Sequence, residues 1–100
     1  MEIEEIFWIG APANAKLTGV QRAAARKAPG TVLAGEVVGT GILKPGDFAL
    51  HEGIRFKIER IEAFRENLDR VQPPRNVGLV LGTQVNKDLF RTGQELRFSR

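Results

Sequence analysis

The sequence contains no cysteine and no hydrophobic run of the roughly 18 residues that a membrane-spanning helix needs. Without cysteine, the chain forms no disulfide, no thiolate metal site and no cysteine nucleophile, which agrees with a reducing compartment. A signal-peptide pattern is also missing, because Met1 is followed by the acidic residues Glu2, Glu4 and Glu5. We therefore expect a soluble, cytoplasmic protein that makes no contact with a membrane.

Residues that carry catalysis or hold cofactors are also scarce. His51 is the only histidine, and the sequence offers it no partners for a metal site or a catalytic triad, so we expect it on the surface. The 100 residues contain no Gly-x-x-x-x-Gly-Lys-Ser/Thr loop, so we expect no nucleotide hydrolysis. The sequence thus predicts no enzyme, no metal and no cofactor.

Short β-rich segments, separated by glycine and proline, make up most of the chain. Its 42% hydrophobic and 27% charged residues are ordinary for one soluble domain, which we expect to span residues 1–100. We expect strands at residues 2–9, 31–38, 54–59 and 76–82, and a last strand that ends at Phe98. Five or six short strands without a long helix predict an all-β fold, a small antiparallel barrel. Its expected core includes Ile61, Phe64, Val77, Leu79 and Leu81.

Local signals between these strands predict turns and one irregularity. Residues 44–47, Lys-Pro-Gly-Asp, have the proline and glycine positions of a type II turn, and residues 52–53 mark a tight reversal. The apolar alternation slips by one position at residues 60–61, which predicts a β-bulge. Pro73 and Pro74 lack ladder donors and predict a loop, and a short helical turn is expected from Lys87.

Residues 10–29 differ from the rest of the sequence. They are rich in alanine, and their spacing predicts a short amphipathic helix over residues 13–28 that ends at Pro29 and Gly30. The segment carries four basic residues and no acidic one, namely Lys16, Arg22, Arg26 and Lys27. Two interpretations stand: a solvated basic face with the alanine side packed on the barrel, or an arm that contacts phosphates.

Three successive segments carry a family pattern: GTVLAGEVVGTGILKPGD, IEAFRENLD and NVGLVLGTQVNKDLFRTGQEL. Their order resembles the second domain of elongation factor Tu and related translational GTPases. That domain has a Gly-Thr-Val strand, a Lys-x-Gly turn, a Glu-x-Phe-Arg strand and an Asn-Val-Gly strand in the same succession. The resemblance covers residues 2–9 and roughly residues 30–98, and it implies a six-stranded Greek-key β-barrel. Residues 10–29 are an insertion relative to the family.

The resemblance also implies a binding site. In elongation factor Tu this barrel helps to hold the 3′ end of aminoacyl-tRNA, with a Glu and apolar neighbours around the terminal adenosine. The matching polar positions here are Glu62, Arg65 and Asn76, and the matching apolar walls are Gly41, Ile42 and Leu81. From the residues alone, Glu62 and Arg65 are as well explained by an exposed ion pair, and Asn76 by a turn.

Two hypotheses for function follow. The first is a non-catalytic module that contacts RNA or a ribonucleoprotein, with tRNA or ribosomal RNA as partner, in a translation-related role. The second is a protein-interaction or scaffold barrel that docks a partner protein, such as a translation-factor-like protein, or associates with itself. Phe7 and Trp8 are adjacent in a strand and point to opposite faces, so one of them is expected to be exposed. Two interpretations stand for such a ring: stacking on bases, or packing in the core or under the inserted helix.

Overall fold

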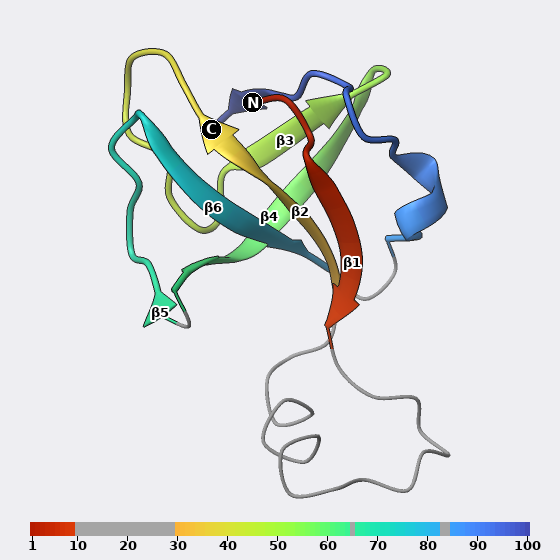
Figure 1. The fold of residues 1–100 in the computed structure, drawn as a ribbon. Helices are drawn as coiled ribbons and strands as arrows, with labels where there is room; N and C mark the ends of the chain where they lie inside the picture. The colour runs from red at the N-terminus through yellow and green to blue at the C-terminus, as the bar shows by residue number, and fades with distance from the viewer. Residues whose placement is uncertain (10–29, 65, 83–84) are drawn as a thin grey trace, which may run out of the picture.

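The computed structural model describes residues 1–9, 30–64, 66–82 and 85–100, and these form an antiparallel β-sheet structure (Figure 1). The strands are β1 (Glu5–Ile9), β2 (Gly30–Val37), β3 (Phe48–His51), β4 (Ile54–Ala63), β5 (Glu66–Asn67), β6 (Arg75–Leu81) and β7 (Arg97–Ser99). A short 3-10 helix, η1 (Lys87–Leu89), lies between β6 and β7, where the sequence predicts a helical turn. The all-β prediction is confirmed. The helix predicted over residues 13–28 lies outside the described residues.

The strands follow the order β1-β2-β6-β4-β3-β7, and the two-residue β5 pairs with β4. Every neighbouring pair is antiparallel. Besides β5, strand β4 pairs with two further strands: residues 54–57 pair with β3 and residues 58–62 pair with β6. The register shifts between Ile58 and Arg60, which confirms the predicted β-bulge and separates the two halves of β4.

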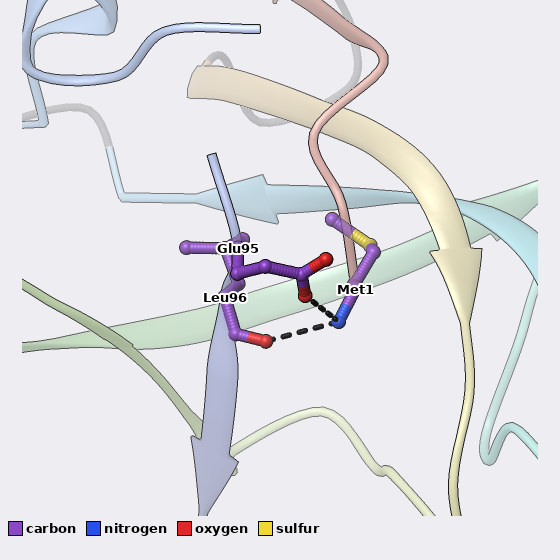
Figure 2. Close-up of polar contacts among 3 residues, drawn as sticks. All are labelled: Met1, Glu95 and Leu96. Atoms are coloured by element: carbon purple, nitrogen blue, oxygen red, sulfur yellow. Dashed lines mark hydrogen bonds and ion pairs between the residues drawn. The ribbon is translucent and has the colours of Figure 1, made fainter. Parts of the chain in front are cut away.

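The first residues of the chain pair with the segment just before β7. Ile3 donates to the carbonyl of Gln94 at 2.8 Å, and the amide of Leu96 donates to the carbonyl of Met1 at 2.7 Å. Figure 2 shows the amino group of Met1 donating to the carbonyl of Leu96 at 3.0 Å, with the Glu95 carboxylate 3.5 Å away. These contacts attach the residues that precede β1 to the segment that precedes β7.

A close backbone approach fixes the same region. The carbonyl oxygen of Glu2 lies against the α-carbon side of Gly35, at the position that a Cβ atom would occupy. Gly35 is buried in the middle of β2, so β2 and the N-terminal segment pass each other without an intervening side chain. Only glycine allows that approach.

One hydrophobic core lies inside the curved sheet. It contains alternate residues of β2, β4 and β6, together with Met1, Ile3, Leu43, Val71, Phe90 and Leu96 from the ends and loops. Ile61, Val77, Leu79 and Leu81 belong to it, as the sequence predicts. Phe64 does not, and its predicted place in the core is wrong: its side chain is 90% exposed.

The predicted turns are present. Gly46 has a φ of +96° and Asp47 donates to the carbonyl of Lys44 at 3.0 Å, as a type II turn requires. Glu52 and Gly53 have φ values of +49° and +80° between the paired residues His51 and Ile54. Two successive positive φ values are typical of the type I′ hairpin turn.

The prediction that His51 is a surface residue is wrong. Its side chain is only 7% exposed, since His51 follows Ala49 on the inward face of β3. Its Nε2 lies 3.0 Å from the carbonyl oxygen of Leu89, and its ring centroid lies 4.9 Å from that of Phe90. A hydrogen bond and a ring contact therefore accommodate a polar ring at the edge of the core.

Within the described ranges, no helix has the length and apolar character that crossing a membrane would need.

Candidate functional site

The outer face of β1, β2, β6 and β4 carries two rows of side chains that run across the strands. Phe7, Val32, Val80 and Arg60 form one row, because each is the register partner of the next. Glu5, Ala34, Gly78 and Glu62 form the second row in the same way. Successive residues of a strand point to opposite faces, so the buried residues Leu33, Leu79 and Ile61 point to the core between these rows.

The second row has small residues at its centre, and a trough lies over them. Ala34 and Gly78 provide its floor, and a Cβ atom on Gly78 would lie 3.1 Å from Cγ1 of Val32. The trough has a volume of about 450 Å³. Its walls come from three parts of the sheet: Glu4, Glu5 and Phe7 at β1, Glu62 and Phe64 at the end of β4, and Asn76 on β6.

The trough brings two of the predicted polar site residues together. Glu62 is half-buried and faces Gly78, and Asn76 lies two residues earlier on β6, opposite Glu36 of β2. Both side chains line the same hollow, although 13 positions separate them in the sequence. The third residue of the predicted trio, Arg65, lies outside the described residues.

Arg60 orients Glu62 from the neighbouring row. The Arg60 Nε atom donates to Oε1 of Glu62 at 3.0 Å, and the two side chains are only 17% and 15% exposed. The Nη2 atom of Arg60 is buried and has no hydrogen-bond partner within the described residues. A buried donor without a partner typically costs about 1–3 kcal/mol, so an acceptor that reached it would be favoured.

Phe64 is the trough residue that the sequence interpretation missed. It follows Ala63 at the turn into β5. Its backbone φ is +50°, a value that residues other than glycine, asparagine and aspartate rarely adopt. A signal for its exposure was available: Ile61 and Ala63 point inward, so strand alternation alone places Phe64 outward. Alternation counted from Ile58 instead places Phe64 inward, because it ignores the register shift between Ile58 and Arg60.

Phe7 and Trp8 are both partly exposed, at 41% and 43%. Neither ring is buried in the core, and the alternative that one of them packs under the inserted segment involves residues outside the described ones. Phe7 lines the trough and Trp8 follows it near the end of the strand. Phe7 and Phe64 therefore give the trough two accessible aromatic rings, whereas Trp8 points to the opposite face of β1.

The predicted apolar walls lie elsewhere. Gly41 and Ile42 line a separate hollow of about 260 Å³ beside Pro73 and Phe98. Leu81 is fully buried in the core and lines neither hollow. The four basic residues of the predicted arm, Lys16, Arg22, Arg26 and Lys27, lie outside the described residues.

The described part of the chain holds no group of three or more His, Cys, Asp or Glu side chains that could bind a metal ion. The lining of the trough combines aromatic faces with three carboxylates, Glu4, Glu5 and Glu62, and one side-chain amide, Asn76. Comparison of the chain with protein-family models found no match, and comparison with curated proteins found none either.

Proposed function

We propose that this chain is a non-catalytic RNA-binding module that holds an unstacked nucleobase in the trough between Phe7 and Phe64. The observation that carries the proposal is the convergence of Glu62 and Asn76 with two accessible phenylalanine rings over a floor of small residues. Proteins that recognise RNA by sequence mostly bind unpaired bases, which they stack on aromatic side chains and hydrogen-bond along the base edges.

Each wall of the trough has a defined part in this proposal. The rings of Phe7 and Phe64 offer stacking surfaces, worth about 1–3 kcal/mol per base. The carboxylate of Glu62 accepts a hydrogen bond from an exocyclic amino group, and the amide of Asn76 both donates and accepts. Adenine presents a donor at N6 beside an acceptor at N7, and an asparagine amide matches that pair.

The resemblance to the second domain of elongation factor Tu supports the same ligand. It favours adenosine at the 3′ end of a tRNA, with ribosomal RNA as the alternative RNA partner in a translation-related role. We further propose that the sheet closes into a Greek-key barrel of that type. The hydrogen bonds of Met1 and Ile3 with the segment before β7 support closure, since they bring the residues that precede the first strand of the order beside those that precede the last.

A titration of isotope-labelled protein with a short RNA ending in CCA tests the proposal. We expect amide shifts centred on Ala34, Glu62, Asn76 and Gly78, and weaker shifts when the last nucleotide is changed to uridine. The variant Asn76→Ala should lose the preference for adenosine and keep its fold, because Asn76 is exposed. Amide shifts that are the same with either terminal nucleotide, or that do not include the trough residues, would contradict the proposal.

A second candidate function rests on the exposed aromatic rings. Phe64, Phe7 and Trp8 would also suit a partner protein or a second copy of the chain, because aromatic residues are enriched at protein interfaces. Docking through apolar groups changes little with salt, whereas RNA binding weakens steeply. Sedimentation of the protein alone at several concentrations tests self-association, and Phe64→Asn should shift any dimer towards monomer.

A further inference from the structure

The molecule has a second outward sheet face, formed by β3, β7 and the first half of β4. Ala49, Phe56 and Phe98 point to the core, so the residues between them point outward. Two rows cross this face. Lys57, Phe48 and Ser99 are register partners in one row, and Arg55, Leu50 and Arg97 are partners in the other. We call these six residues the basic face.

The basic face carries positive charge only. Arg55, Lys57 and Arg97 are all exposed, and none of its six residues is acidic. The mean separation along a strand places Arg55 and Lys57 about 7 Å apart, and two strand spacings place Arg55 about 10 Å from Arg97. Three cations at such spacings form a surface that attracts a chain of regularly spaced negative charges.

One of these cations is held in place. The guanidinium carbon of Arg55 lies 4.1 Å from the ring centroid of Phe48, and its Nη2 donates to the carbonyl of Arg100 at 3.2 Å. The ring contact and the hydrogen bond together restrict the motion of the guanidinium group, which has further N–H groups to donate. A guanidinium group ordered in this way loses less conformational entropy when it binds a phosphate in a bidentate fashion.

The apolar residues of the basic face decide between possible partners. Phe48 and Leu50 are only half-exposed, and the Arg55 guanidinium group covers the ring of Phe48, so this face offers no fully exposed apolar side chain for insertion into a lipid surface. Phosphates of a flexible polyanion need no such group, because charge and hydrogen bonding alone supply affinity.

We propose that the basic face binds the phosphate backbone of single-stranded RNA without reading its sequence. The choice of RNA among polyanions rests on the proposed function, whereas the face itself shares no residue with the trough. The trough takes a base and the basic face takes phosphates, so the two sites contribute separately to one RNA complex.

The test compares two ligands and three variants by fluorescence anisotropy between about 50 and about 200 mM salt. One ligand is a uridine oligomer ending in adenosine, and the other is an abasic ribose-phosphate chain of the same length. The face variant is Arg55→Gln/Lys57→Gln/Arg97→Gln. The control variant, Arg70→Gln/Lys87→Gln/Arg91→Gln, removes the same charge from exposed residues outside both sites. Asn76→Ala is the trough variant.

For both ligands, we expect the face variant to reduce the magnitude of the slope of log K against log salt by about 2, since about 0.7 is lost per phosphate contact. The control variant should change the slope much less. If Arg55→Gln destabilises the fold, the double variant Lys57→Gln/Arg97→Gln still tests the face. For it we expect the magnitude of the slope to fall by about 1.4.

Other outcomes overturn one proposal or the other. If the slope of log K against log salt falls equally in the face and control variants, only net charge matters, and the basic-face proposal is contradicted. Tighter binding to anionic vesicles than to RNA would overturn it in favour of a lipid surface. If the wild-type protein binds the oligomer but not the abasic chain, the basic-face proposal is contradicted and the trough proposal still stands. A last outcome separates the two proposals in the other direction. If the face variant loses binding to the abasic chain and Asn76→Ala leaves binding to the oligomer unchanged, the basic-face proposal is supported and the trough proposal is contradicted.

Discussion

The carbonyl oxygen of Glu2 occupies the position that a Cβ atom on Gly35 would need. Gly35 lies in β2, whereas Glu2 forms a bridge with Glu95 just before β7. The contact between the beginning and the end of the described chain therefore depends on the absence of one side chain in the middle of β2.

Replacing Gly35 by alanine should lower the free energy of unfolding by about 1–3 kcal/mol, because the added methyl group displaces buried backbone. Gly82→Ala is the matched control, since a Cβ atom there would meet only Oε1 of Glu59, at 3.7 Å. Urea denaturation measures both variants. Equal transition midpoints would mean that the N-terminal segment moves aside without cost.

Thr31→Val should destabilise the fold by about 1–3 kcal/mol, although it preserves shape and adds apolar surface. The Thr31 hydroxyl is fully buried and donates to the carbonyl oxygen of Val85 at 2.6 Å, so valine leaves that carbonyl without its donor. Thr40→Val, at an exposed position, serves as the control and should be close to neutral. Thermal unfolding of both variants checks this prediction.

Phe64→Asn should increase stability and decrease RNA binding at the same time. Asparagine tolerates the φ of +50° at this position better than phenylalanine, which should gain up to about 1 kcal/mol. Loss of the ring should weaken binding by about 1–3 kcal/mol if it stacks on a base.

Glu52→Asn is the matched control for Phe64→Asn. Glu52 has a φ of +49° in a hairpin turn away from the trough, and Asn-Gly is the favoured sequence of that turn. The control should therefore also gain stability and should leave RNA binding unchanged. A parallel loss of binding in both variants would mean that the positive φ, rather than the Phe64 ring, affects the site.

The ion pair between Arg60 and Glu62 should show a coupling energy of about 1 kcal/mol in a double-mutant cycle of Arg60→Met and Glu62→Gln. Both side chains are mostly buried, so solvent screens their charges less than it screens a surface pair. Urea denaturation of the four proteins gives the coupling. A coupling near zero would mean that Arg60 does not hold the Glu62 carboxylate.

Local chemistry explains which parts of the fold were predictable. The turn at residues 44–47 and the reversal at residues 52–53 depend on proline and glycine torsion preferences, which neighbouring residues hardly alter. The bulge in β4 was visible because it interrupts a simple alternation. The burial of His51 was not visible in the sequence, because the carbonyl that accepts its hydrogen bond belongs to Leu89, far away along the chain.

The candidate sites depend on strand order, which alternation does not reveal. The residues alone placed Glu62 and Asn76 on separate strands, and the family resemblance was the only reason to group them. Their common trough follows from the pairing of β6 with β4. The basic face was missed altogether, because Arg97 joins Arg55 and Lys57 only through β3.

Strand β4 carries both candidate sites, with Arg55 in its first half and Glu62 in its second. The seven steps between them correspond to at most about 23 Å of extended chain. The strand would thus set a fixed distance between the two proposed binding sites. Once one site holds a ligand longer than this distance, the other binds at a raised effective concentration, and shorter ligands gain no such avidity.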